Sequence, residues 1–227
     1  MKIAISGMIG CGKSTLSKQL ANHYQNSMLL EELDSNDDIF NTFLEWIYQK
    51  YPNIDIAFQS YIIESISERF KNAEAEFLKN HNHKRHHIFL DRFNVEHHIF
   101  ATVTLEQKPA KYLNAFNALF DYIIDLKDNP DLAIFLDADF DVIQNRILKR
   151  GRDVEIENFD LNIDYFKRLH RLYRPLFEQL VQKYNIPYKI INTNDLDALS
   201  GVWRSNKNYR SICWWKIDII WYLFLSI

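Results

Sequence analysis

Cysteine is scarce in this sequence, where Cys11 and Cys213 are the only two among 227 residues. They lie far apart and in no metal-ligand spacing, so neither a disulfide framework nor a zinc site is expected, and a reducing cytoplasm suits the chain. A strong charge of one sign is also missing, because 27 basic and 30 acidic side chains give a formal net charge of -3. We therefore expect no general binding to nucleic acid or to an anionic membrane.

Long apolar runs are missing as well. Met1 leads directly into a short apolar stretch, with no signal region and no cleavage site behind it. Residues 219–227 carry no charge, but a membrane-spanning helix needs about 20 apolar residues. We expect a cytoplasmic protein without a membrane span. The aromatic, apolar tail 201–227 is assigned no role, and a membrane-surface contact, a partner contact and a non-native terminus stay open for it.

Glycine and proline number only five each, and no linker or repeat is visible, so we expect one domain over 1–200. Short β-like runs alternate with longer helical patterns, which is typical of a parallel sheet. The strand runs are apolar at consecutive positions, as expected when helices cover both faces of the sheet. We predict strands at 2–6, 28–31, 87–90, 132–136 and 188–191, and helices at 13–24, 37–50, 54–80, 96–104, 109–126, 140–150 and 159–184.

A glycine-rich motif lies between the first predicted strand and the first predicted helix. Residues 7–14 read GMIGCGKS and fit G-x-x-x-x-G-K-[ST] in full. In such a loop the backbone N–H groups point inward, and the helix N-terminus adds attraction for phosphate. Lys13 is expected on the terminal phosphates of ATP and the Ser14 hydroxyl on Mg²⁺. The loop residues predicted to bind ATP are Gly7, Met8, Ile9, Gly10, Cys11, Gly12, Lys13 and Ser14.

Phosphate binding alone does not separate a nucleotide switch from a kinase. Guanine-specific switches carry an N-K-x-D signature, and the nearest segment here, 192–195, lacks the lysine. Asn194 in that segment stays a candidate nucleotide contact. Arg146, Arg150 and Arg152 form an R-x-x-x-R-x-R cluster, which predicts a lid that neutralises charge on the transferring phosphoryl group. A solvated basic helix end is the alternative.

Charged pairs follow the second and third predicted strands. Glu31 and Glu32 end the second strand, at the edge where open α/β sheets bind ligands, and one of them is a candidate base. Asp91 and Arg92 end the third strand. The arginine suits orienting the base or holding developing charge, and the carboxylate suits assisting Mg²⁺ through water. Ordinary strand-end ion pairs are the alternative.

With these motifs in this order, residues 1–195 resemble the deoxynucleoside kinase family. In that family the glycine-rich loop is followed by a base written E-P, an F-Q helix, an E/D-R-S motif and an arginine-rich lid. The resemblance implies a three-layer α/β P-loop kinase fold, with a five-stranded parallel sheet flanked by helices. It also implies phosphorylation of a deoxynucleoside at its 5′-hydroxyl, with ATP and Mg²⁺, by a homodimer or a heterodimer with a related chain. The matching segments here are Glu32-Leu33, Phe58-Gln59, Asp91-Arg92-Phe93 and 146–152 followed by Glu155.

The resemblance also implies roles for single residues. Glu32 would deprotonate the 5′-hydroxyl, Arg92 would hold it in place, and Gln59 would read the base edge. Tyr48 and Glu155 would bind the 3′-hydroxyl, with core packing as the alternative for Tyr48 and Phe58. The catalytic residues are then Glu32, Arg92 and Lys13, the metal-site residues are Ser14 and Asp91, and the substrate-binding residues are Glu32, Tyr48, Phe58, Gln59, Arg92, Glu96, His97 and Glu155.

The sequence departs from the family pattern at several positions. Leu33 replaces the usual proline, so Glu31 stays an alternative base, and Phe93 replaces a small hydroxyl residue. Purine- and cytosine-preferring members commonly pair an arginine with an aspartate, where this chain has Ile66 and either Glu96 or His97. The preferred base is therefore left open. Six of the eight histidines lie within 81–98, and for those at 81, 83, 86 and 87 we favour a solvated loop over a metal site.

Two other functions remain open from the sequence. A nucleoside monophosphate kinase of the thymidylate type shares the loop, the Asp-Arg pair and the lid, but needs cations for the acceptor phosphate, and only Arg69 is a candidate near Gln59. A catalytically weak, nucleotide-binding partner subunit is suggested by Leu33 and Phe93.

Overall fold

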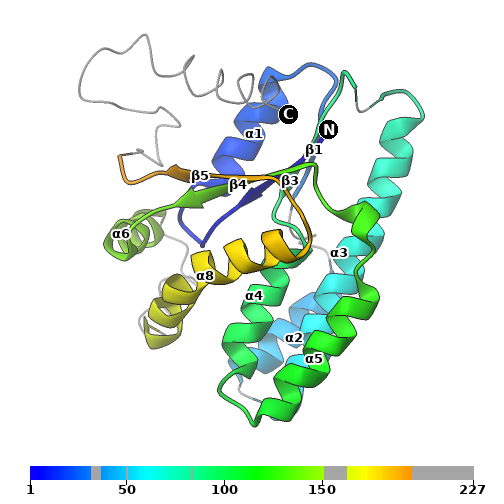
Figure 1. Ribbon diagram of the computed structural model, residues 1–227. Coiled ribbons are helices and arrows are strands. Elements are labelled where there is room, and N and C mark those ends of the chain that lie inside the picture. The colour runs from blue at the N-terminus through cyan, green and yellow to red at the C-terminus, as the bar shows by residue number, and fades with distance from the viewer. Residues whose placement is uncertain (32–36, 50, 83, 151–162, 196–227) are drawn as a thin grey trace.

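A parallel sheet of five strands forms the centre of the computed structural model, which describes residues 1–31, 37–49, 51–82, 84–150 and 163–195 (Figure 1). The strand order is β2-β3-β1-β4-β5, and every neighbouring pair is parallel. This confirms the predicted fold class. The strands are β1 (Lys2–Ser6), β2 (Met28–Leu30), β3 (Ile88–Asp91), β4 (Leu132–Asp137) and β5 (Tyr188–Asn192).

Helices connect the strands in the way that parallel pairing requires. They are α1 (Lys13–His23), α2 (Asp38–Tyr48), α3 (Asp55–Leu78), α4 (Asn94–Leu105), α5 (Ala110–Ile123), the short 3₁₀ helix η1 (Leu126–Asp128), α6 (Phe140–Arg150) and α8 (Ile163–Lys183). Within the described ranges, no helix has the length and apolar character to cross a membrane. The tail 201–227 lies outside those ranges.

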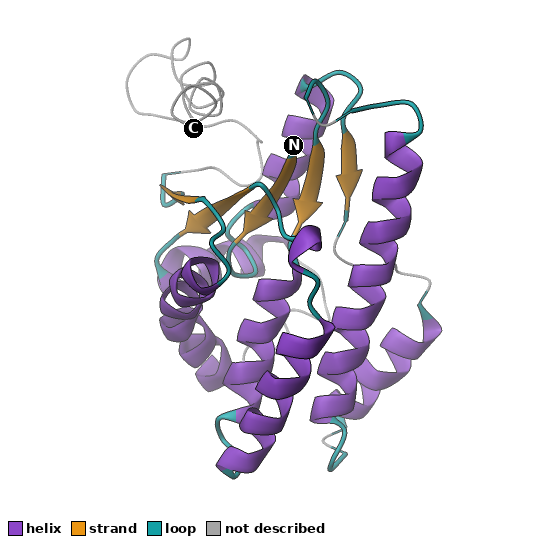
Figure 2. Ribbon diagram, turned by 45° about the vertical axis from the view of Figure 1, so that its right-hand side comes forward, coloured by secondary structure: helices purple, strands orange, loops and turns teal. Residues whose placement is uncertain are grey.

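The side chains of β1 divide between two buried clusters, one on each face of the sheet. Ile3 and Ile5 pack with Leu20 of α1 on one face. Ala4 belongs to the larger cluster on the other face, which includes Phe77 of α3 and Phe177 of α8. Figures 1 and 2 show α1 on one side of the sheet and α3, α4, α5 and α8 on the other. Alternation along a strand thus produces the three layers.

Several described helix boundaries differ from the sequence prediction by up to three residues, and the local backbone explains two of them. Helix α4 begins at Asn94 rather than at residue 96, because Phe93 is still extended (φ -152°, ψ 177°) and forms the N-cap. Helix α5 ends at Ile123, since residues 126–128 form η1, where the Asp125 side chain accepts a hydrogen bond from the Lys127 N–H. The extended backbone of Phe93 and of Ile124 (φ -71°, ψ 118°) sets both boundaries.

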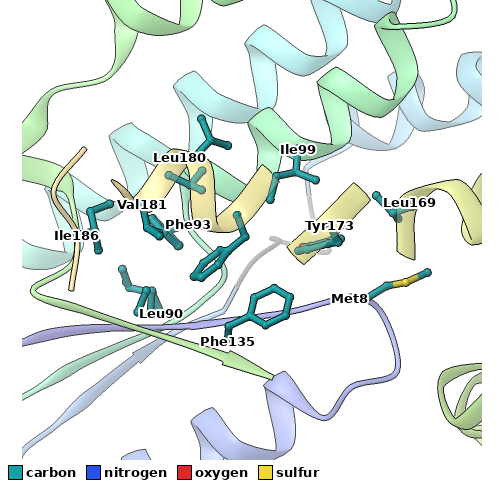
Figure 3. Packing of buried hydrophobic residues seen from close by; sticks show 14 of the residues in the cluster. Met8, Leu90, Phe93, Ile99, Phe135, Leu169, Tyr173, Leu180, Val181 and Ile186 are labelled. Carbon is teal, nitrogen blue, oxygen red and sulfur yellow. The ribbon is translucent and has the colours of Figure 1, made fainter. Parts of the chain in front are cut away.

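Phe93 is a core residue. Its side chain is buried in the larger cluster together with Leu90, Val181 and Ile186 (Figure 3). The bulk that replaces the family's small hydroxyl residue is therefore directed into the core. As the N-cap of α4 it makes no side-chain capping hydrogen bond, a bond that a serine or threonine provides at such a position.

Candidate active site

The glycine-rich loop adopts backbone angles that require glycine. Gly7, Gly10 and Gly12 have φ values of 135°, 85° and 102°. A Cβ on Gly7 would lie 2.5 Å from the carbonyl oxygen of Leu136 and 2.7 Å from Cys11 Sγ, and L side chains avoid this region in any case. The loop closes with a hydrogen bond of 3.2 Å from the Cys11 N–H to the Met8 carbonyl. Its end joins the N-terminus of α1 at Lys13, which is the arrangement that binds phosphate.

Lys13 and Ser14 occupy the first turn of α1. The Lys13 side chain is buried, and its Nζ donates to the Met8 carbonyl at 3.2 Å, so the ammonium lies against the loop backbone. A buried cation with one neutral acceptor is suited to receiving an anion. Ser14 is exposed, which leaves its hydroxyl accessible. The loop therefore fits the terminal phosphates of a nucleotide and, through Ser14, a magnesium ion.

Arg92 lies at the end of β3 in a left-handed backbone conformation, with φ 76°. Its N–H donates to the Ile5 carbonyl at 3.2 Å, which ties the turn to β1. The guanidinium is buried, lies 4.7 Å from the centre of the Phe100 ring, and donates through Nη1 to the Tyr173 hydroxyl at 3.4 Å. A strained conformation at a non-glycine residue persists only when its surroundings enforce it, and such residues cluster at functional sites.

Glu96 connects the loop to this arginine. It is fully buried, and its Oε1 accepts from the Gly7 N–H at 2.9 Å and from the Tyr173 hydroxyl at 2.6 Å. Burial raises the pKa of the Glu96 carboxyl, while the nearby Arg92 and Lys13 oppose that rise. The side chain predicted as a substrate contact thus lies against the phosphate loop.

A pocket opens beside the loop, at the carboxyl ends of β2 and β3. It is lined by Leu30, Glu31, Ile66, Arg69, Asp91, Arg92 and His97. Glu96 and His97 were the two candidates for the position of the family's aspartate, and of these His97 lines the pocket. Burial, and then the positive charge of Arg92, lowers the pKa of His97 to about 3. The imidazole is therefore neutral at physiological pH and offers one donor and one acceptor.

Several buried polar atoms in this region have no hydrogen-bond partner among the residues that the structure describes. They are Ser6 Oγ, Gln59 Oε1, Asp91 Oδ1, Glu96 Oε2 and His97 Nε2. Buried polar groups in folded proteins are almost always hydrogen-bonded to protein or to water. Ser6 and Asp91 end the neighbouring strands β1 and β3, and both Asp91 and His97 line the pocket. Such a concentration of unused polar atoms indicates a site for a polar ligand.

Of the two glutamates proposed as the base, the structure describes only Glu31. The Glu31 carboxylate is half exposed and forms a salt bridge of 2.8 Å with Lys18 of α1, while its carbonyl accepts from Arg69 at 3.3 Å. Glu32 lies outside the described residues, as do Arg152 and Glu155. Tyr48 and Arg150 end α2 and α6 respectively.

Phe58 and Gln59 are both buried on α3. Phe58 packs against Phe40 and Phe43 of α2, with ring centres 5.7 Å apart in each case. The packing role is thus present, and the roles of both residues toward a substrate stay predictions.

Arg146 and Asn194 lie at the β4 and β5 end of the site. Arg146 is buried and donates to both the carbonyl and the hydroxyl of Thr193. Asn194 forms two hydrogen bonds with Asp139, of 2.8 and 3.0 Å, which join the loops that follow β4 and β5. Both residues hold the loops at this end together, and their contact with a nucleotide stays a prediction.

Within the described part of the chain, no group of three or more histidine, cysteine or carboxylate residues is arranged to hold a metal ion. His81 instead stacks on Phe77, with ring centres 4.5 Å apart, and meets His86 edge-on at 4.9 Å. A magnesium ion at Ser14 and Asp91 would therefore take most of its ligands from phosphate oxygens and water.

Tyr173 is the site residue that the sequence did not indicate. It lies within α8, and its ring is part of the large core cluster (Figure 3). At that position an apolar-faced helix is expected to present a packing residue, and nothing local marks the hydroxyl as a partner of Glu96 and Arg92.

Comparison with known proteins places the chain among kinases. A family model described as deoxynucleoside kinase matches residues 3–211. An uncharacterized protein of Mycoplasma genitalium is 32% identical over 195 residues, which is 84% of this chain and 82% of that protein. The deoxyguanosine kinase of Lactobacillus johnsonii is 28% identical over 208 residues, 88% of this chain and 85% of the enzyme.

Solved structures show the same fold. A deoxyadenosine kinase from M. mycoides, with the products dCMP and a flexible dCDP bound, matches with a TM-score of 0.68 at 23% identity, over 100% of both chains. The same kinase with bound dATP matches with a TM-score of 0.66 at 24% identity, over 88% of this chain and 95% of that one. Since the family model covers most of the sequence, the chain belongs to the deoxynucleoside kinase family.

Proposed function

We propose that this chain transfers the terminal phosphate of ATP to the 5′-hydroxyl of a deoxynucleoside. The observation that carries this proposal is the position of the pocket: Asp91, Arg92 and His97 line a space at the strand ends next to the phosphate loop. Phosphoryl transfer requires the donor phosphate and the acceptor hydroxyl to be held close and in line, in a site that neutralises charge. The loop and the pocket supply these two halves.

Each residue has a chemical task in this proposal. Lys13 and the loop N–H groups bind the phosphates, and Arg92 stabilises the charge that develops near the acceptor oxygen. Glu32 accepts the proton of the 5′-hydroxyl. Ser14 and Asp91 would hold Mg²⁺, which would neutralise charge on the phosphate oxygens. Arg150 and Arg152 complete the donor side, and Tyr48, Gln59 and Glu155 hold the nucleoside.

The salt bridge of Glu31 with Lys18 supports Glu32 as the base. The Glu31 carboxylate is engaged with the ammonium of Lys18 on α1. This favours the neighbouring glutamate for the proton transfer.

The test is an assay of the purified protein with labelled ATP and each natural deoxynucleoside. Relatives are named deoxyguanosine kinase and deoxyadenosine/deoxycytidine kinase, so deoxyguanosine, deoxyadenosine and deoxycytidine are the first acceptors to compare, with thymidine as the fourth. A variant Lys13→Ala should lose phosphorylation with every acceptor. Failure to phosphorylate any of the four would exclude the proposed activity.

A second candidate is a nucleoside monophosphate kinase, because Arg69 and Arg92 line the same pocket. Two guanidinium groups suit an acceptor that already carries a phosphate. Competition between a deoxynucleoside and its monophosphate separates the two activities, since only the preferred acceptor inhibits use of the other at low concentration.

We also propose that the protein acts in the cytoplasm as a dimer, either of this chain alone or with a related chain. The long helices α3 and α5 are the candidate contact, and Tyr122 on α5 is 89% exposed in the single chain. Light scattering of the purified protein measures the mass directly.

Phe93 does not line the pocket, so its bulk gives no support to an inactive partner subunit.

A further inference from the structure

Four residues from four parts of the fold form one buried chain of hydrogen bonds. The Gly7 N–H donates to Glu96 Oε1 at 2.9 Å, the Tyr173 hydroxyl donates to the same oxygen at 2.6 Å, and Arg92 Nη1 donates to the Tyr173 hydroxyl oxygen at 3.4 Å. This series of hydrogen bonds therefore runs from the phosphate loop, through α4 and α8, to the residue after β3. It joins the donor half of the site to the acceptor half.

At Gly7 this series of hydrogen bonds holds the phosphate loop in position. Its backbone has φ 135°, and the space where a Cβ would be is taken by the Leu136 carbonyl and by Cys11 Sγ. A buried N–H needs a partner, and here the partner is a carboxylate from another element. The same oxygen accepts from a second donor, so one side chain fixes both groups.

At Tyr173 the same series of hydrogen bonds holds the Arg92 guanidinium in position. Its hydroxyl donates to Glu96 and accepts from Arg92, so the guanidinium polarises a group that already faces a carboxylate. Hydrogen bonds in series strengthen one another in a low-dielectric interior. The aromatic ring of Phe100 holds the other side of the Arg92 guanidinium at 4.7 Å.

We propose that Glu96 is a positioning residue: its carboxylate oxygen fixes the phosphate loop and, through Tyr173, the Arg92 guanidinium, and so sets the separation between phosphate donor and acceptor. Glu96 itself does not line the pocket. This inference rests on the proposed binding of nucleotide at the loop, but its main measurement is nucleotide affinity and does not require a known acceptor.

The experiment compares Glu96→Ala with Glu96→Gln, which keeps a carbonyl oxygen for the Gly7 and Tyr173 donors. Calorimetry gives the Kd for Mg·ATP, and thermal unfolding shows that each variant is folded. Glu96→Ala is expected to raise the Kd about tenfold, the size of one lost hydrogen bond to a charged group. Glu96→Gln is expected to stay within about threefold of the unchanged protein, since it restores the acceptor.

Tyr173→Phe isolates the second link, because it releases Arg92 and leaves the bond between Glu96 and Gly7. Its Kd for Mg·ATP is expected to change less than about twofold while kcat falls about tenfold. Tyr184→Phe is the matched control, since the Tyr184 hydroxyl also donates to a carboxylate, Asp121 Oδ1 at 2.8 Å, away from the site. It should alter neither quantity.

A folded Glu96→Ala protein with unchanged nucleotide affinity would overturn the proposal. So would a Glu96→Gln protein as impaired as the alanine variant, or a Tyr173→Phe protein with unchanged kcat. If Glu96→Ala does not fold, Glu96→Gln and Tyr173→Phe decide the matter by the same criteria. If the unchanged protein binds Mg·ATP but phosphorylates no deoxynucleoside, the proposed activity fails, and the affinities of the Glu96 variants still test the positioning of the loop.

Discussion

Glu31 and Lys18 form a salt bridge of 2.8 Å across the surface between β2 and α1. Both side chains are more than half exposed, so the pair contributes little to stability, but it fixes where the carboxylate points. The first prediction follows from this geometry. Glu31→Gln should leave kcat within about threefold, whereas Glu32→Gln should lower kcat by about 10²–10⁴, the range for loss of a general base.

Steady-state rates at saturating ATP and acceptor measure both variants, and nucleotide affinity should survive in each. A large loss of kcat in Glu31→Gln, with Glu32→Gln active, would reverse the assignment of the base.

Gly7→Ala should destabilise the fold and weaken nucleotide binding together. The added Cβ meets the Leu136 carbonyl at 2.5 Å in a backbone region unfavourable to alanine, so a loss of at least about 2 kcal/mol of unfolding free energy is expected. Gly12→Ala is the matched control, because its φ is also positive but no atom lies within 4 Å of the new Cβ. Urea unfolding should show a smaller loss for Gly12→Ala, and equal losses would contradict the steric explanation.

Phe93→Ser should lower stability by about 2–4 kcal/mol. Removing a buried phenylalanine costs about 3–5 kcal/mol, and a serine at the N-cap of α4 returns about 1 kcal/mol. Since Phe93 does not line the pocket, kcat should change little at temperatures where the variant is folded. Chemical unfolding and the kinase assay measure the two effects. A stable Phe93→Ser protein with altered kcat would place this side chain in the site instead of the core.

Burial of His97 and His98 should make the fold sensitive to acid. The pKa values are lowered from 6.5 to about 3 and about 4, so the unfolded chain takes up protons that the folded chain excludes. Their contribution is complete above pH 6.5 and is lost as the pH falls toward those values, at up to about 1.4 kcal/mol per pH unit for each histidine. Urea unfolding between pH 7 and 4.5 measures this slope. His97→Gln should make it shallower, and an unchanged slope would exclude a neutral, buried His97.

Most of the fold was predictable because its signals are local. Consecutive apolar residues mark β1 and β4, and the phosphate loop identifies what lies between β1 and α1. The arrangement of side chains was less predictable, since it depends on distances between elements. The substrate contact of Glu96 stays a prediction, whereas its bonds to Gly7 and Tyr173 are contacts about which the spacing in the sequence contains no information. Arg146 likewise has bonds to Thr193 that follow from the pairing of β4 with β5.

The strand order has a consequence for how the two halves of the site move. The phosphate loop follows β1, which is paired on both sides, whereas Glu31 follows β2, a strand of three residues at the edge of the sheet. Amide protons of a central strand exchange with solvent only when the whole domain opens, and those of a short edge strand exchange through local fraying. The phosphate loop is thus anchored to the rigid centre of the sheet, and Glu31 is attached to its most easily opened strand.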